Sequence, residues 1–169
     1  GLPSQMTAMD LSQGMLDVGI KKVAEKGLTD RITLIQGDSE NLPFQDETFD
    51  AYTVAFGVRN FEDLDRGLSE MYRVLTPGSL TLILEFSNPK SFPIKQLFGF
   101  YFKHIMPVLG RLISKDPAAY TYLPESVKAF PEGAEFLDRL KTAHFIDLRA
   151  IPLTGGIDSI YLGRKPGPE

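Results

Sequence analysis

Short apolar segments alternate along much of this chain with segments whose apolar residues recur at helical spacing. Because sequential strands that are separated by helices run in the same direction, this alternation predicts a parallel sheet with crossover helices. The segment at 49–56 is mostly apolar on both faces, which is typical of a strand buried inside such a sheet. The predicted strands are residues 6–9, 32–36, 49–56 and 80–86, and the predicted helices lie between Ser12 and Gly27 and over 63–75.

The end of the chain departs from this alternation. Residues 145–153 and 157–164 have the composition of strands, and Gly155-Gly156 between them forms a short turn. We therefore predict an antiparallel hairpin appended to the sheet. The 169 residues suit one α/β domain of Rossmann-like type, in which a mostly parallel sheet ends in this hairpin.

Composition excludes several classes of function. The formal net charge of −4 makes nucleic acid an unexpected partner, and the absence of cysteine excludes disulfides, thiolate metal sites and cysteine nucleophiles. His104 and His144 are too few and too far apart to suggest zinc, so no metal is predicted. No apolar run reaches the roughly 20 residues that span a bilayer, and the first residues do not resemble a signal peptide. These features predict a cytoplasmic protein.

The segment at 90–115 stands apart because it is rich in aromatic and aliphatic residues while its only charged residues are basic. It follows the predicted strand at 80–86, so we expect an insertion over 90–130 to lie above the carboxyl edge of the sheet. One interpretation is that the segment adds to the core. The one-sided charge favours a second interpretation, a lid for a long apolar substrate or a contact with the inner face of an anionic membrane.

Two acidic residues end neighbouring strands. Asp10 ends the first predicted strand, where a carboxylate can accept both hydroxyls of a ribose; the alternative is an acid that the dipole of the next helix stabilises. Asp38 ends the strand at 32–36 and could read an adenine edge, or it could simply form a turn. Because open α/β sheets bind ligands at the carboxyl ends of their strands, the pair together favours ligand binding.

A cation and a carboxylate follow two other strands. Arg59 comes after the strand at 49–56 and could stabilise a developing oxyanion; the alternative is a surface arginine that pairs with Glu62 or Asp63. Glu85 lies in an apolar strand, so its carboxylate must be paired or protonated. It could contact a ligand or accept a neighbouring backbone N–H.

His104 lies within the basic apolar segment. It could act as a general base, because imidazole titrates near neutrality, or it could serve packing or an interface. His144 precedes a strand away from the predicted crevice, and we interpret it as structural.

Several blocks form a set: MDLSQGML at 9–16, GDSENLPF at 37–44, FGVRN at 56–60, YRVLTPG at 72–78, LEFS at 84–87 and YTYLPESVKAF at 120–130. Together they resemble the C-methyltransferases of ubiquinone and menaquinone biosynthesis, the UbiE/MenG family, over nearly the whole chain. The features at Asp10 and Pro77-Gly78 are shared by many class I methyltransferases. The blocks at 56–60 and 120–130 are more specific.

The resemblance implies a class I fold that binds S-adenosyl-L-methionine (AdoMet). By motif match, Asp10 would bind the ribose, and Asp38 with Ser39 would flank the adenine. Ala55 stands where related enzymes often carry a serine in contact with the cofactor, so a contact at this position would come from the backbone.

The resemblance also implies methylation of a ring carbon of a polyprenyl quinol, with demethylmenaquinol favoured over the benzoquinol of the ubiquinone pathway. Arg59 would face the quinol and stabilise the oxyanion that makes the ring carbon nucleophilic. Arg59 acting through water, or His104, would take the proton. No metal is required.

The first strand and the glycine-rich turn of that family would precede Gln5 and are not in this sequence. We therefore expect an N-terminally incomplete fold and weak AdoMet binding by these residues alone. Two strand edges would lack a neighbour, which together with the apolar segment favours a homodimer. Two alternatives stay open: another small-molecule AdoMet methyltransferase of the same fold, and a non-catalytic module that binds quinone or partner enzymes.

Overall fold

The computed structural model describes residues 5–105 and 118–168. Its elements in chain order are β1 (Met6–Asp10), α1 (Gln13–Glu25), β2 (Ile32–Gln36), β3 (Phe49–Ala55), η1 (Val58–Asn60), α2 (Leu64–Val74), β4 (Leu75–Phe86), α3 (Ile94–Phe100), η2 (Tyr101–Ile105), α5 (Ala118–Ala129), α6 (Ala134–Thr142), β5 (Ile146–Leu153), η3 (Thr154–Gly156) and β6 (Asp158–Arg164). The predicted alternation of strands and helices is confirmed.

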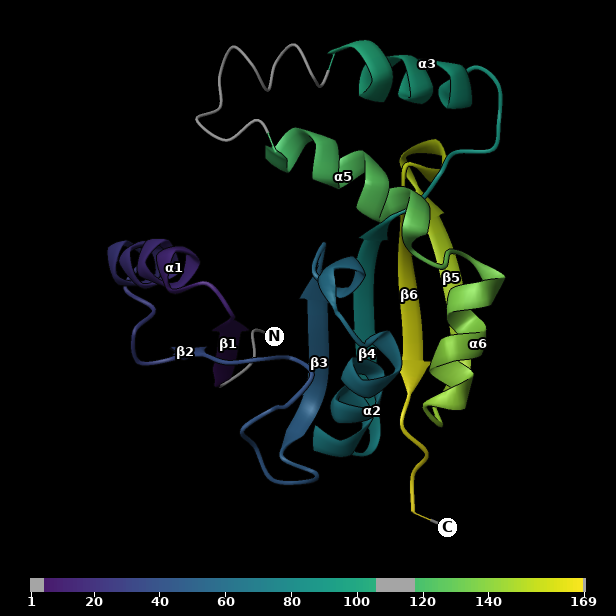
Figure 1. Cartoon of the computed structure of the whole chain (residues 1–169). Coiled ribbons are helices and arrows are strands. Elements are labelled where there is room, and N and C mark those ends of the chain that lie inside the picture. The colour runs from purple at the N-terminus through teal and green to yellow at the C-terminus, as the bar shows by residue number, and fades with distance from the viewer. Residues whose placement is uncertain (1–4, 106–117, 169) are drawn as a thin grey trace.

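The strands form two sheets, as Figure 1 shows. A two-stranded sheet pairs β1 with β2 in parallel, and a four-stranded sheet has the order β3-β4-β6-β5. In the larger sheet β3 and β4 are parallel, while β6 is antiparallel to both β4 and β5. The predicted parallel pairing and the antiparallel hairpin are therefore both present.

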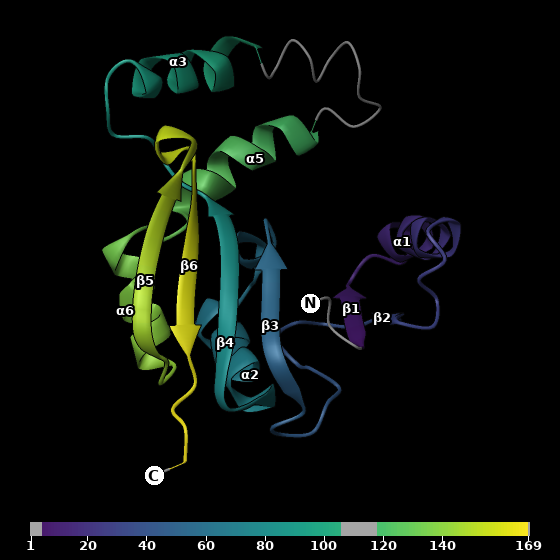
Figure 2. The same cartoon turned by 180° about the vertical axis from the view of Figure 1, so that it is seen from behind.

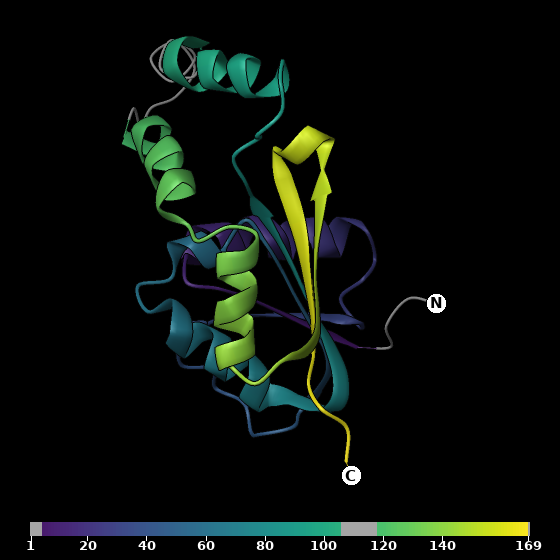
Figure 3. The same ribbon diagram turned by 90° about the vertical axis from the view of Figure 1, so that its right-hand side faces the viewer.

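The core lies between one face of the four-stranded sheet and the helices α2 and α6 (Figure 3). Asp63 caps α2 by accepting the N–H of Arg66 at 3.0 Å, which satisfies a donor that the first turn would otherwise leave unpaired. The apolar stripe of α2 then faces the sheet. The fully buried side chains of this core include Leu68, Met71, Ile83, Phe136, Leu140 and Tyr161.

In the part of the chain that the structure describes, no helix covers the other face of the same sheet, as Figure 2 shows from behind. Leu80 and Leu82 on β4 are 45% and 38% exposed, and Ala51 and Thr53 on β3 are exposed as well. The prediction that 49–56 is buried on both faces is therefore wrong for the described residues. The reason is that helices pack on only one face, so alternate side chains of β3 point away from the core.

Strand β4 begins earlier than predicted. The sequence predicts that the helix includes Leu75 and that the strand starts at residue 80, yet the chain enters β4 at Leu75, which pairs with Phe49. Gly78 adopts a φ of 85°, and its N–H donates to the carbonyl of Lys165 at 3.0 Å. This contact with the C-terminal segment keeps the Pro77-Gly78 region in the strand rather than in a free turn.

Helices α3 and α5 lie above the carboxyl ends of β3 and β4, where the insertion was expected (Figures 1 and 3). A Cβ atom at Gly155 in η3 would collide with the Cδ1 of Ile94, so α3 begins in close contact with the turn of the hairpin. Residues 106–115 of the basic apolar segment lie outside the described residues. No helix in the described ranges is long and apolar enough to cross a membrane.

Candidate active site at the carboxyl edges of the two sheets

Asp10 and Asp38 lie close together at the ends of paired strands. Asp10 pairs with Gln36 in the register of β1 and β2, and its carbonyl accepts the N–H of Gly37 at 3.2 Å. The Oδ1 of Asp10 accepts the N–H of Ser12, and the Oδ1 of Asp38 accepts the N–H of Glu40, each at 2.8 Å. Both side chains are exposed. One oxygen of each carboxylate therefore shapes its own loop, and the second oxygen can accept a ligand hydroxyl or amine.

Ser39 and Ala55 connect this pair to the larger sheet. The hydroxyl of Ser39 forms a hydrogen bond with the side chain of Tyr52 on β3. Burial raises the pKa of Tyr52, a trend that this hydrogen bond opposes and that nearby Glu70 reinforces. Ala55 is the last residue of β3 and is exposed. The loop after β2 and the end of β3 therefore contribute to one carboxyl edge.

Glu40 bridges the two sheets, a role that sequence reasoning missed. Its Oε1 accepts the N–H of Glu62 at 2.6 Å and its Oε2 accepts the N–H of Asp63 at 3.0 Å. These N–H groups precede α2, where the helix dipole favours a negative charge. Because the donor N–H groups lie in backbone more than 20 residues further along the chain, no local pattern could have identified this bridge.

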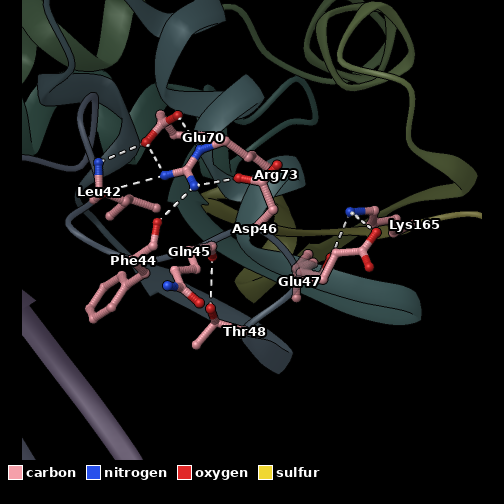
Figure 4. A network of polar contacts seen from close by, with 10 residues as sticks. Leu42, Phe44, Gln45, Asp46, Glu47, Thr48, Glu70, Arg73 and Lys165 are labelled. Atoms are coloured by element: carbon pink, nitrogen blue, oxygen red, sulfur yellow. Dashed lines mark hydrogen bonds and ion pairs between the residues drawn. The ribbon is translucent and has the colours of Figure 1, made fainter.

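Arg73 on α2 holds the rest of the same loop (Figure 4). Its guanidinium donates to the carbonyls of Leu42 and Phe44 at 3.0 and 2.7 Å, and to the carboxylate of Glu70. The Oε2 of Glu70 in turn accepts the N–H of Leu42 at 2.8 Å. The hydrogen bond from Arg73 holds the pKa of Glu70 below its ordinary value. The network fixes the loop that carries Asp38 against the helix that carries the core.

Arg59 and Glu85 form the centre of the polar site on the larger sheet. The Nη1 of Arg59 lies 2.8 Å from the Oε1 of Glu85, and the backbone N–H of Arg59 donates to Oε2 at 3.2 Å. Glu85 also accepts the N–H of Phe86 at 3.0 Å. The expected alternative, a surface pair of Arg59 with Glu62 or Asp63, is wrong, because the guanidinium turns inward to the end of β4. Of the alternatives stated for Glu85, the structure shows a paired carboxylate that accepts neighbouring backbone N–H groups.

The guanidinium of Arg59 is held from several sides. Its Nη1 also donates to the carbonyl of Phe56, and its Cζ lies 5.3 Å from the ring centroid of Phe86. Phe56 adopts a φ of 57°, an uncommon conformation for a residue with a side chain. The Nε of Arg59 is buried and has no hydrogen-bond partner among the described residues. The guanidinium of Arg59 is therefore held in one position, and its Nε–H has no hydrogen bond to any described residue.

Asn60, next to Arg59, connects the site to α5. The hydroxyl of Tyr122 donates to the Oδ1 of Asn60 at 2.9 Å. Tyr122 belongs to the block at 120–130 that the sequence singled out, although the side chains of Tyr120 and Thr121 lie outside what the structure describes. The contact joins the helix above the sheet to the residues beside the ion pair.

His104 is the site candidate that the structure does not bring to the strand ends. It lies on η2, its side chain is exposed, and its ring centroid is 5.0 Å from that of Phe100. Within residues 5–105 and 118–168, no hydrogen bond, ion pair or ring contact joins His104 to Arg59. Within the same ranges, no cluster of acidic or histidine side chains is arranged to hold a metal ion.

The residues fit a nucleoside cofactor on the β1–β2 side of the edge. Two carboxylates at adjacent strand ends offer oxygen acceptors, which suit ribose hydroxyls and the amine of an adenine. The apolar side chains of Leu42 and Phe44 follow in the same loop, which Arg73 holds in place. Asp10, Asp38 and Ser39 are therefore the groups of this chain that would hold the cofactor.

Solved structures share the fold. An AdoMet-dependent methyltransferase from Aquifex aeolicus matches with a TM-score of 0.66 and 17% identity, over 95% of this chain and 68% of that chain. Phosphoethanolamine N-methyltransferase 2 from Haemonchus contortus, solved in complex with S-adenosyl-L-methionine, matches with a TM-score of 0.69 and 16% identity, over 96% of this chain and 43% of that chain. The chain therefore has the α/β fold of AdoMet-dependent methyltransferases, as predicted.

Sequence comparison gives the family. The model of the ubiE/COQ5 methyltransferase family matches residues 2–165, and the chain belongs to this family. It is 47% identical to a demethylmenaquinone methyltransferase of Bacteroides fragilis, over 96% of this chain and 66% of that protein. It is 42% identical to the mitochondrial 2-methoxy-6-polyprenyl-1,4-benzoquinol methylase of Dictyostelium discoideum, over 97% of this chain and 54% of that protein. The chain thus spans just under two thirds of the length of the first of these relatives and about half of the second, and the predicted family resemblance is confirmed.

Proposed function

We propose that this chain carries the quinol-binding part and most of the cofactor-binding part of an AdoMet-dependent C-methyltransferase of respiratory quinone biosynthesis. Membership of the ubiE/COQ5 family supports this reaction. Relatives from Bacteroides fragilis and Porphyromonas gingivalis, both 47% identical, are named demethylmenaquinone methyltransferases. We therefore favour demethylmenaquinol as the substrate, with the benzoquinol of the ubiquinone pathway as the alternative.

The observation that carries the proposal is the buried pair of Arg59 and Glu85 at the ends of β3 and β4. A quinol ring carbon becomes nucleophilic when an adjacent hydroxyl loses its proton. A guanidinium fixed by a carboxylate, a carbonyl and an aromatic ring can stabilise that oxyanion without reorganising during the reaction. Glu85 thus orients Arg59, and Arg59 contacts the substrate oxygen.

The cofactor, when bound, supplies an electrophilic methyl group. Asp10 would hold its ribose, Asp38 and Ser39 would flank its adenine, and a contact at Ala55 would come from the backbone. In our proposal a water molecule held by the Arg59 guanidinium takes the quinol proton and passes it to solvent, and His104 is the second candidate for the proton acceptor. Methyl transfer needs an in-line approach, so positioning by these residues does most of the work.

A membrane contact extends the proposal. Phe92, Leu97 and Phe100, in and just before α3, are 82%, 65% and 58% exposed, and Lys90 and Lys95 beside them are exposed cations. Apolar and basic side chains on one surface suit the interface of an anionic leaflet, where a polyprenyl quinol resides. We propose a cytoplasmic protein that contacts the inner face of the membrane through 90–115, with 90–130 as the substrate lid.

A vesicle experiment tests this contact. The variant Leu97→Ser/Phe100→Ser should bind anionic vesicles at least several-fold more weakly in a flotation assay than the parent protein. Val18→Ser in α1 is the matched control, because it also removes an exposed apolar side chain. Equal flotation of all three proteins argues against the contact.

We also propose a homodimer. Within the described residues, one edge of β1 and one edge of β3 have no neighbouring strand, and open edges invite pairing. Sedimentation equilibrium over a range of protein concentrations decides between monomer and dimer, and a monomer at all concentrations removes this part of the proposal.

Calorimetric titration with S-adenosylhomocysteine tests the function first. We expect weak or no binding by the 169-residue chain and clear binding by a protein extended upstream to the length of the relatives. The extended protein should then methylate demethylmenaquinol. If neither protein binds the cofactor product, the non-catalytic quinone-binding or partner-binding module becomes the better interpretation.

A further inference from the structure

A cavity of about 400 Å³ lies between α3, α5 and the segment that follows β4. Its size falls within the range of small-molecule sites, about 300–1,000 Å³. Helices α3 and α5, which carry most of the lining, lie above the carboxyl edge of the four-stranded sheet (Figure 1). The lining residues are Asn88, Pro89, Lys95, Phe98, Gly99, Pro124, Val127 and Lys128.

The lining is suited to a hydrocarbon chain. Phe98, Pro124 and Val127 present apolar surface from the two helices. Among the described lining residues Asn88 is the uncharged polar one, and its N–H and its side-chain amide both donate to Glu132. Lys95 and Lys128 are exposed, so their charged ends can stay in solvent while their aliphatic stems line the rim. A ligand in this cavity therefore gains from burying apolar surface rather than from polar contacts.

The cavity adjoins the polar site through two elements. Strand β4 carries Glu85 near its end, and the segment that follows the strand contains Asn88 and Pro89 of the cavity wall. Helix α5 carries Pro124 and Val127, and it also carries Tyr122, which binds Asn60 beside Arg59. We infer from these shared elements that a molecule whose polar ring sits at Arg59 can place an apolar substituent in the cavity.

We propose that this cavity binds the first isoprene units of the prenyl tail of the quinol, and that it makes the site selective for tailed quinols. The inference rests on the proposed function and deepens it. The tail beyond the cavity continues along α3, where Leu97 and Phe100 are exposed. The cavity thus connects the reacting ring to the surface that we propose for the membrane.

Gly99 provides the test. A Cβ atom built at Gly99 meets no atom within 4 Å, so a larger side chain enters open space rather than the protein. Leucine also favours a helix over glycine, by roughly 1 kcal/mol, so the variant should fold. Because Gly99 is a lining residue, we expect the side chain in Gly99→Leu to narrow the cavity, and Gln96→Leu on the same helix is the control because it lies outside the lining.

The assay uses the enzyme extended to full length and two substrates. One is a demethylnaphthoquinol with a prenyl tail, and the other has the same ring with a methyl group in place of the tail. For Gly99→Leu we expect kcat/KM to fall about tenfold or more for the tailed quinol, mostly through KM, and to stay unchanged for the tail-less one. Gln96→Leu should change neither value. Gly99→Ala should give a smaller effect of the same kind.

The failures can be told apart. If Gly99→Leu affects both substrates equally or neither, while the parent enzyme methylates them, the tail site is overturned and the proposed reaction stands. If the parent enzyme, loaded with AdoMet, methylates no quinol at all, the proposed function fails and the tail site falls with it.

Discussion

Arg59 and Glu85 form an ion pair whose carboxylate is completely buried and whose guanidinium is only 11% exposed, with 2.8 Å between Nη1 and Oε1. Two charges are expensive to remove from water, and their mutual attraction offsets this cost only when the geometry is good. Here the Glu85 carboxylate also accepts two backbone N–H groups, from Arg59 and Phe86. The pair is placed to orient a cation at the edge where strands end.

Glu85→Leu should destabilise the protein by about 3–5 kcal/mol in urea unfolding, because it leaves the Arg59 guanidinium buried without its partner. The double variant Arg59→Met/Glu85→Leu should recover most of this stability, since well-packed apolar residues can replace a buried pair. It should nevertheless lack activity. Activity in the stable double variant would show that the pair serves only the fold.

Arg59→Ala should abolish quinol methylation in the extended enzyme while leaving the affinity for S-adenosylhomocysteine nearly unchanged, because the cofactor residues lie on the β1–β2 side. Arg59→Lys should also be impaired, since an ammonium lacks the planar guanidinium that lies over the ring of Phe86 while its Nη1 donates to Glu85 and Phe56. Turnover is measured well below the melting temperature of each variant. Unchanged turnover in Arg59→Ala removes Arg59 from the mechanism.

His104→Ala separates the two candidates for the proton acceptor. If Arg59 acts through water, kcat and its pH profile should match those of the parent enzyme, because His104 is an exposed neighbour of Phe100. A fall in kcat of about 100-fold or more, with loss of the acidic limb of the pH profile, would assign the general base to His104 instead.

Glu40→Ala should weaken cofactor binding, although the Glu40 carboxylate is not one of the groups that we propose to hold the cofactor. Without the two hydrogen bonds to Glu62 and Asp63, the loop that carries Asp38 loses its tie to α2, at a cost of about 1.5–3 kcal/mol in unfolding free energy. Calorimetry should show a higher Kd for S-adenosylhomocysteine. Glu62→Gln is the control, because its exposed side chain has no part in the bridge.

The pKa of Glu70 predicts an acid dependence of stability. Arg73 holds this pKa below 4.5, so the carboxylate contributes stability that is fully present above about pH 4.5 and is lost as the pH falls through the lower folded value. In Glu70→Gln the slope of stability against pH in this acid range should flatten. Glu25→Gln, at an exposed position of α1, should keep the slope of the parent protein. Identical slopes in all three proteins would contradict the assignment.

The sequence predicted the local elements and the family with good accuracy. Ser12 and Asp63 cap their helices as such residues do, and the hairpin turns at Gly155-Gly156 as predicted. Asp10 and Asp38 could be assigned to adjacent strand ends because two features can be recognised from nearby residues. These are the two-residue side-chain repeat of each strand and the length of the helical connection between the strands.

Only the tertiary structure decided the partners of the charged residues. Arg59 turns to Glu85 rather than to the nearby acids, Glu40 reaches the start of α2, and Tyr122 reaches Asn60. It also decided that one face of β3 is uncovered and that a cavity forms between α3 and α5. Periodicity and capping depend on residues a few positions apart, so the sequence by itself determined the elements. The contacts between distant residues depend on how those elements pack, and no pattern along the chain encodes that packing.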